Sequence, residues 1–247
     1  MTVRAFPRPG MYHLPFLDAR SETPTAMTFR FGIEGRGFRY LPNQFVGLGL
    51  HGVEDPWGPV RRFSLSSSPT ETDAIAITSK MTGSPYKEAL KALAPGEFVE
   101  VRGPIGDFVL DEDRPAVMVA GGIGITPFRG MIRYAADSRL RHPIVLVYSA
   151  RTPEEFAFRG ELDRLAEDWR ELRTHYTITR PAQSEAPWDG RIGRIDASLL
   201  REATAGLDAP VWYVCGLPRM VNDVGLRLVR ELSVPVEDIK VERFMGY

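Results

Sequence analysis

Cysteine and histidine are scarce in this chain of 247 residues. Cys215 is the only cysteine, which excludes an intramolecular disulfide framework, a zinc site built from several cysteines and an iron–sulfur cluster held by four thiolates. The four histidines, at positions 13, 51, 142 and 175, show no ligand spacing. We therefore expect no metal site.

Long apolar runs and blocks of one charge are also missing. No segment approaches the roughly 20 apolar residues that span a bilayer, and prolines and a glycine interrupt residues 1–16, where a signal peptide needs an apolar core. The 31 basic and 32 acidic residues give a net charge of −1 without a strongly basic run, which argues against a nucleic-acid partner. The default expectation is a cytoplasmic protein with no membrane span.

What is present is typical of a folded protein of one large or two modest domains, with 43% hydrophobic and 26% charged residues. The pattern changes near residue 112. Before that point, short β-like runs are separated by glycine and proline, and one helix is expected at 85–93. This spacing predicts a small antiparallel barrel or sandwich. The β-like runs cover 26–33, 37–50, 61–68, 74–81 and 97–103.

After residue 112 the pattern alternates between strand and helix. The strand-like runs are almost continuously apolar, as in a parallel sheet buried on both faces. Thr126 before Pro127 predicts a helix N-cap, Thr152 with Glu155 a capping box, and Asp196 another cap. We predict a doubly wound α/β domain with ligands at the carboxyl ends of its strands. The strand-like runs cover 115–121, 143–150, 174–179 and 210–216.

Glycines follow the first of these parallel strands, in the segment GGIGITP (121–127). A glycine-rich turn lets the backbone approach a ligand, and the helix after it offers free N–H groups to a pyrophosphate. Pro127 stands where the usual G-x-G-x-x-G pattern has its third glycine, and a tight turn without a nucleotide is the alternative.

Two further segments allow a functional and a structural interpretation. Cys215 at a strand end is either a thiol in a cleft or a small buried apolar residue. The segment RRFSLSSSP (61–69) combines guanidinium groups, an aromatic ring and hydroxyls. It either presents a phosphate-binding arginine and hydroxyl donors to a flat heterocycle or is a polar strand that runs into a serine turn.

Four motifs together resemble the ferredoxin–NADP reductase superfamily. Arg61-x-Phe63-Ser64-x-x-Ser67 resembles its flavin-binding R-x-Y-S-x-x-S, and GGIGITPFR (121–129) resembles its nicotinamide-dinucleotide loop. YVCGLPRM (213–220) is similar to its C-G-P/L-x-x-M segment, and KVERF (240–244) to its C-terminal V-E-x-aromatic. The motifs follow the order of the family and span nearly the whole chain.

The resemblance implies a flavoprotein that passes hydride from NADPH or NADH to FAD. Residues 1–111 would be the FAD-binding barrel and residues 112–247 the NAD(P)H-binding domain. FMN is the alternative flavin, and the Gly83–Ser84 pair with its helix favours FAD. Arg151, Arg180 and Arg194 at strand ends favour NADPH over NADH, because a 2′-phosphate needs guanidinium partners.

The resemblance also implies roles for individual residues. Ser64 lies beside the flavin N5 atom, Cys215 lines the pocket without a covalent bond, Glu242 lies near the nicotinamide and Phe244 covers the second face of the flavin. Tyr247 is the alternative stacking ring. Arg61 and Phe63 contact the flavin phosphate and the flavin ring. The cofactor-binding residues implied are Arg61, Phe63, Ser64, Ser67, Lys80, Gly83, Ser84, Gly122, Gly124, Thr126, Arg151, Arg180, Arg194, Gly216 and Tyr247.

The electron acceptor is expected to be a separate protein, because the chain has neither the cysteines nor the room for an iron–sulfur domain. A ferredoxin, a flavodoxin or an oxygenase component fits. Lys80, Lys87, Lys91 and Arg102 form either a docking face for an acidic partner or a solvated surface. The alternative functions are a diaphorase-type reductase of free flavin, quinone or ferric chelates, and an electron-transfer subunit without turnover.

Overall fold

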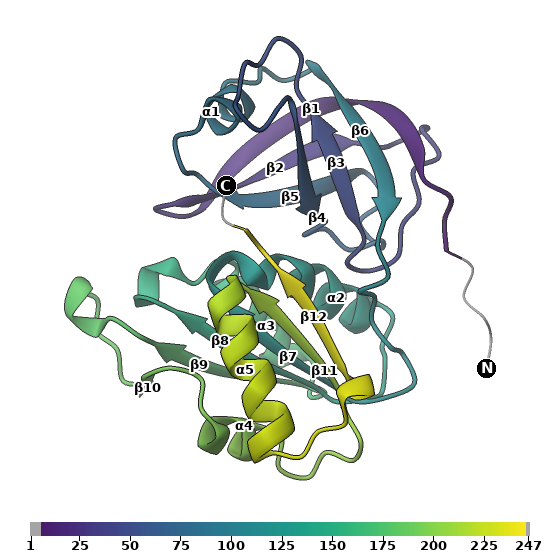
Figure 1. Ribbon diagram of the computed structural model, residues 1–247. Helices are drawn as coiled ribbons and strands as arrows, with labels where there is room; N and C mark the ends of the chain where they lie inside the picture. Colours follow the sequence, from purple (N-terminus) through teal and green to yellow (C-terminus); the bar gives the residue numbers. More distant parts are fainter. Residues whose placement is uncertain (1–5, 246–247) are drawn as a thin grey trace.

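The first half of the chain forms an antiparallel barrel in the computed structural model, which describes residues 6–245 (Figure 1). Its six strands are hydrogen-bonded in the order β4-β3-β6-β1-β2-β5, and an isolated bridge between Leu65 and Ile77 joins the two edges. Helix α1 follows the fifth strand. The elements are β1 (Gly10–Thr23), β2 (Ala26–Gly32), β3 (Phe45–Gly49), β4 (Val60–Ser64), β5 (Ala74–Lys80), α1 (Pro85–Lys91) and β6 (Phe98–Ile105).

The barrel interior is filled by the apolar residues that alternate along these strands. Phe29, Phe31, Leu48, Ile77 and Val101 are completely buried in it. Burial of one such side chain stabilises a fold by about 1.5–3 kcal/mol. Apolar alternation therefore sets which side of each strand faces inward.

Two parts of the barrel differ from the prediction. The 14-residue strand β1 was not predicted, because Pro15 and the charged residues of its second half hide the alternation; it pairs with β6 in its first half and with β2 in its second. The run expected at 37–50 contains only β3. Residues 41–44 form a turn in which Gln44 N donates to Leu41 O, and Asn43 has a φ of 69°.

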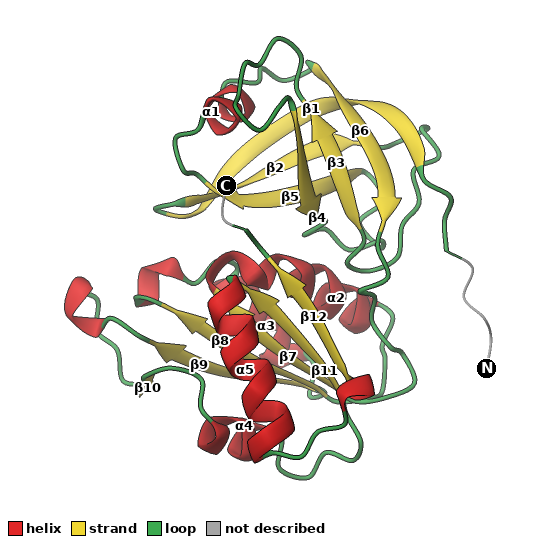
Figure 2. Ribbon diagram, in the orientation of Figure 1, coloured by secondary structure: helices red, strands yellow, loops and turns green. Residues whose placement is uncertain are grey.

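The second half forms a six-stranded parallel sheet in the order β10-β9-β8-β7-β11-β12, covered by helices on both faces (Figure 2). The prediction of an antiparallel barrel followed by a doubly wound domain is confirmed. The elements are β7 (Ala116–Gly121), α2 (Thr126–Asp137), β8 (Ile144–Ala150), α3 (Arg159–Asp168), β9 (Leu172–Ile178), β10 (Arg191–Ile192), α4 (Ala197–Ala203), β11 (Val211–Gly216), α5 (Pro218–Glu231) and β12 (Ile239–Arg243).

Strand β7 shows why the parallel strands are apolar at every position. Met118 packs into the cluster with Phe128 of α2. Val117 and Val119 pack into the cluster with Leu228 of α5. Both faces of the strand are therefore in a core. No helix within residues 6–245 is long and apolar enough to cross a membrane.

Only one of the three predicted helix caps is present. Asp196 caps α4, because its carboxylate accepts from Leu199 N at 2.8 Å. Thr126 makes no capping bond, since a 3₁₀ turn at Gly122–Ile125 leads directly into α2. The capping box at Thr152 is also wrong: Pro153–Glu155 form a short 3₁₀ turn, and α3 begins at Arg159 after three buried residues, 156–158.

Candidate active site

The switch point of the parallel sheet lies between β7 and β11, which are neighbours although three strands separate them in the chain. The turn after β7 and the end of β11 touch: a Cβ atom on Gly124 would lie 2.3 Å from Cys215 O. Gly124 is thus required for packing of the two strand ends. Gly122 has a φ of 54° with open space at its Cβ position, so it is the glycine of this turn that leaves room beside the backbone.

Ser64 and Glu242 connect the barrel to this switch point. The Ser64 hydroxyl at the end of β4 donates to the two carboxylate oxygens of Glu242 on β12, at 3.3 and 3.4 Å. Asn43 adds a side-chain hydrogen bond to Glu242. Cys215 is the register partner of Glu242 between β11 and β12. Three of the four residues predicted to be catalytic are therefore in one place.

Burial changes the ionisation of this cluster. It raises the pKa of Glu242 to about 7, although the hydrogen bonds from Ser64 and Asn43 act in the opposite direction. Burial, followed by the nearby Glu242 charge, also raises the pKa of the fully buried Cys215 thiol well above its usual range. The carboxyl group can thus take up or release a proton near neutral pH, while the thiol, completely buried in the α/β core, stays protonated.

Arg129 on α2 connects the segment after Ser64 to α2 and α3. This role of Arg129 was not predicted. Its guanidinium is buried and donates to Ser66 O at 3.1 Å, to both oxygens of Glu71 and to both oxygens of Glu161 on α3. Gly130 allows this contact, because a Cβ atom there would lie 2.6 Å from Ser67 O. The segment just after Ser64 is therefore clamped to the helix that follows the nicotinamide-type loop.

The side chains of Arg61 and Ser67 form hydrogen bonds within the barrel. Arg61 pairs with Asp55 and donates to the carbonyl oxygens of Trp57 at 2.7 Å and Gly58 at 2.8 Å. The Ser67 hydroxyl accepts from the Tyr40 hydroxyl at 2.7 Å and from an amide of β5 at 2.9 Å. The structure does not bring these two side chains to Glu242, and the Phe63 ring packs in the barrel core beside Tyr86.

Lys80, Gly83 and Ser84 lie between β5 and α1. Lys80 is half-buried at the end of its strand, Gly83 is exposed with a φ of 74°, and Ser84 caps α1 by accepting from Lys87 N at 3.4 Å. Lys87 itself is buried, so it belongs neither to a docking face nor to a solvated surface, and both predictions are wrong for this residue. Lys91 and Arg102 are exposed.

Arg151, Arg180 and Arg194 lie at the carboxyl ends of three adjacent strands, β8, β9 and β10. Arg180 N donates to Arg151 O at 2.8 Å, and Gly193, next to Arg194, donates to Ile178 O at 2.8 Å. All three side chains are exposed. Within residues 6–245 none of them forms an ion pair, so their charges are available at this edge.

The remaining predicted residues lie around the switch point. Thr126 is buried at the start of α2, and Gly216 closes β11. Phe244 is partly buried against the α/β core, and its amide donates to Gly216 O at 2.9 Å. Tyr247 lies outside the described residues.

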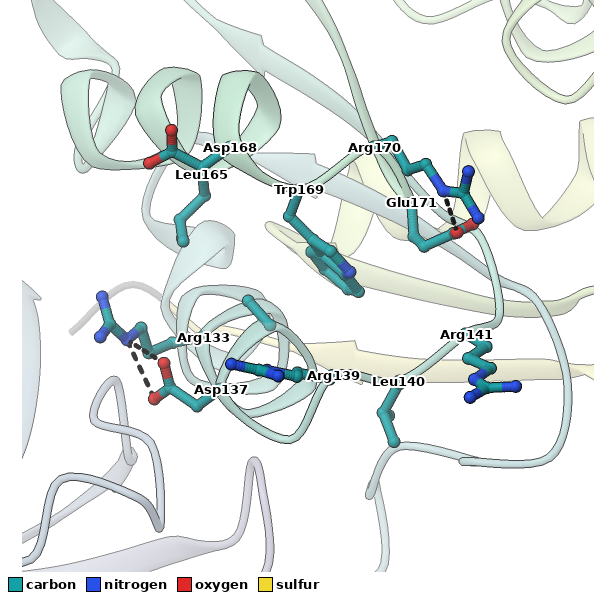
Figure 3. A pocket seen from close by; sticks show the side chains of 11 residues that line it. Arg133, Asp137, Arg139, Leu140, Arg141, Leu165, Asp168, Trp169, Arg170 and Glu171 are labelled. Carbon is teal, nitrogen blue, oxygen red and sulfur yellow. Dashed lines mark hydrogen bonds and ion pairs between the residues drawn. The ribbon is translucent and has the colours of Figure 1, made fainter.

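A groove of about 540 Å³ lies at the opposite edge of the sheet, between the last turns of α2 and α3 (Figure 3). Arginines and acids surround Trp169 there, with ion pairs from Arg133 to Asp137 and from Arg170 to Glu171. This is the amino edge of the strands, so the groove is separate from the Ser64–Glu242 cluster.

Comparison with known proteins shows the family to which the chain belongs. Residues 118–225 match the oxidoreductase NAD-binding domain family. Ferredoxin–NADP reductase B of Sorangium cellulosum is 34% identical over 221 residues, which are 85% of this chain and 88% of that protein. The glycine betaine monooxygenase reductase subunit of Chromohalobacter salexigens is 33% identical over 77% of this chain, which spans 53% of the length of that subunit.

The fold also matches a solved structure. The cytochrome P450 reductase of Amycolatopsis superimposes with a TM-score of 0.81 at 20% identity, over 97% of this chain and 71% of that one. The chain belongs to the ferredoxin–NADP reductase family of flavoproteins. It is an FAD-dependent NAD(P)H oxidoreductase.

Proposed function

We propose that this chain passes hydride from NADPH, or less readily from NADH, to FAD and then delivers electrons to a separate redox protein. The observation that supports this most strongly is the Ser64–Glu242 contact, which places the end of β4 against the switch point of the parallel sheet. In this proposal, residues 1–111 bind FAD and residues 112–247 bind the nicotinamide dinucleotide. Hydride transfer needs both rings within near-attack range, and a seam of this kind provides it.

The residues around β4 and α1 fit a flavin dinucleotide. Ser64 places a hydroxyl at the seam, and Arg61 and Lys87 place buried positive charge close to an exposed glycine turn, while the Phe63 ring packs in the barrel core. FAD, when bound, supplies a centre that accepts a hydride and releases electrons singly or in pairs. Ser64 and Glu242 then hold and move the proton at the N5 atom, while Cys215 and Phe244 shape the pocket.

An anaerobic titration tests the proposed function. The purified protein is expected to show flavin absorbance that bleaches within the mixing time of a stoichiometric addition of NADPH and more slowly with NADH. Protein that binds flavin but stays oxidised with both nucleotides would instead be an electron-transfer subunit without turnover. Equal reduction of free flavin and of every protein acceptor would favour the diaphorase alternative.

The preference for NADPH is expected to depend on the arginines at the strand ends. Arg180→Ala removes a charge-assisted contact to a 2′-phosphate, each worth about 1.5–3 kcal/mol, so the ratio of kcat/KM for NADPH over NADH falls roughly tenfold or more. Arg170→Ala is the matched control, because its side chain is 93% exposed at the opposite edge of the sheet. An unchanged ratio in Arg180→Ala would remove this residue from 2′-phosphate recognition.

Ser64→Ala is expected to slow flavin reduction by NADPH at least about tenfold while FAD affinity changes little, because the hydroxyl acts on the proton at N5. Stopped-flow absorbance measures the reduction and fluorescence titration measures the affinity. Ser66→Ala is the control, since its hydroxyl bonds Thr78 within the barrel at 2.8 Å. Equal rates in the two variants would exclude Ser64 from the chemistry.

The acceptor in this proposal is a ferredoxin, a flavodoxin or an oxygenase component. Support comes from the relatives, one a ferredoxin–NADP reductase and another the reductase subunit of a monooxygenase. Each of these three candidate acceptors is tested directly. The steady-state rate of its reduction is compared with that of ferricyanide as the reference acceptor.

A further inference from the structure

Asn43 lies in the turn at 41–44 before β3, where the barrel reaches the seam between the two halves of the chain. Its φ of 69° is in the left-handed region that favours glycine, and only 2% of its surface is exposed. Its side-chain amide donates to Phe108 O at 2.8 Å, in the connection between β6 and β7. The Phe108 ring packs against Phe128 and Tyr213 of the α/β core. Asn43 therefore links the barrel to the α/β half.

The side chain of Asn43 also hydrogen-bonds the Glu242 carboxylate. A side-chain amide has two N–H donors, so one serves Phe108 O and the other is left for Glu242. Within residues 6–245, the Oδ1 atom of Asn43 is buried without a hydrogen-bond partner. A buried acceptor without a donor lowers stability, and so does a left-handed backbone at a residue other than glycine. Glycine would avoid both losses, so the two N–H bonds are what asparagine adds at this position.

The groups that surround Glu242 come from several elements. Ser64 of β4 donates to its oxygens at 3.3 and 3.4 Å, and the buried Cys215 thiol of β11 is its register partner. On β12 itself, Lys240 donates to a backbone carbonyl at 3.3 Å, and Arg243 bonds a side chain of α5. In the part of the chain that the structure describes, Glu242 forms no ion pair. The hydrogen bonds from Ser64 and the asparagine are therefore what favours its charged form.

We propose that Asn43 is a positioning residue for proton transfer, which orients the Glu242 carboxylate toward Ser64 and stabilises its charged form. The inference rests on the proposed function, in which Ser64 and Glu242 move a proton. The bond to Phe108 O fixes the orientation of the amide, so that its second N–H stays on the carboxylate. Without this donor, burial favours the protonated carboxyl group, which cannot accept a proton from Ser64.

The test follows Tm against pH in the full chain freed of flavin, a measurement that needs no reductase activity. The profile of Glu242→Gln is subtracted in each case, so that only the titration of Glu242 is observed. The unmodified chain is expected to lose stability up to about pH 7, where Glu242 ionises in the folded state. In Asn43→Gly the loss is expected to continue to about one pH unit higher, because the carboxylate has lost a donor. Glycine accommodates the left-handed backbone, so this variant is expected to fold.

Two further variants separate this role from a purely structural one. Gln44→Ala is the matched control in the same turn, because the Gln44 amide bonds Gly106 O at 3.2 Å and Leu41 N rather than Glu242. It is expected to lower Tm at every pH without moving the end of the titration. Asn43→Asp replaces the donor with a second carboxylate, and repulsion between the two charges is expected to move the titration to higher pH than in Asn43→Gly.

Stopped-flow reduction by NADPH is the second measurement, and any step of its rate near pH 7 is expected to move upward with the Tm profile in Asn43→Gly. An Asn43→Gly titration that coincides with that of the unmodified chain, or a shift of the same size in Gln44→Ala, would overturn the role of Asn43. A shifted Tm profile in a chain whose flavin neither nucleotide reduces would support the link between Asn43 and Glu242 and overturn the reductase function instead.

Discussion

Arg129→Met is expected to lower the free energy of unfolding by about 2–4 kcal/mol. Removal of one partner from a buried ion pair costs about 3–5 kcal/mol, and the cost is somewhat smaller here because Glu71 and Glu161 keep partial contact with water. Burial opposes the charge of Arg129, yet its bonds to Glu71 and Glu161 outweigh burial and raise the pKa of the guanidinium above its ordinary value. The cation is therefore present at every accessible pH.

Thermal denaturation measures this effect, with a loss of roughly 5–15 °C in Tm expected for a chain of this size. Arg133→Met is the matched control one turn further along α2, where the side chain is 38% exposed and pairs with Asp137. Such a surface pair contributes about 0.3–0.5 kcal/mol. If the two variants lost the same stability, Arg129 would not be the clamp between the barrel and α2. Hydride transfer is expected to fall as well, because small shifts of the two rings lower the rate steeply.

Glu242→Gln is expected to remove a pH dependence of stability that the unmodified chain shows between about pH 4.5 and pH 7. The folded-state pKa of about 7 lies above the ordinary value of 4.5. The folded state therefore holds the proton more tightly, and the stability present below the unfolded pKa is lost as the pH rises through the folded pKa. At about 1.4 kcal/mol for each pH unit, the total loss is roughly 2–4 kcal/mol.

Glutamine has the shape of the protonated carboxyl group, so Glu242→Gln is expected to match the unmodified chain near pH 5 and to melt higher near pH 8. Glu237→Gln, on the exposed turn before β12, is the control and is expected to leave the pH profile unchanged. Glu242→Gln is also expected to remove any step near pH 7 in the rate of electron release. A pH profile of Tm that is identical in the unmodified chain and Glu242→Gln would contradict the raised pKa.

Much of the architecture was predictable from local pattern. The continuous apolar runs of β7, β8 and β11 indicate burial on both faces, which a parallel sheet with helices on each side supplies. Asp196 was correctly recognised as a cap, because a cap needs only a side chain and an amide three residues away. The start of α3 was wrong, because burial of residues 156–158 against the sheet overrides the local capping signal at Thr152.

The site was predictable only as a set of strand ends. The motif residues Ser64 and Glu242 are 178 positions apart, and no local rule predicts that their side chains meet. Lys87 was expected on the surface, in a docking face or a solvated face, yet the barrel encloses it beside Phe63. Arg129 carried no signal beyond its place in the glycine-rich motif.

The sequence by itself determined a barrel followed by a doubly wound domain, and which candidate site residues stand at strand ends, because apolar periodicity and turn residues act over a few positions. Tertiary structure alone decided which charges are paired, which carboxyl group titrates near neutral pH and which lysine is buried. Those properties depend on the loss of water around each group and on partners from distant segments, and neither is encoded in the local pattern.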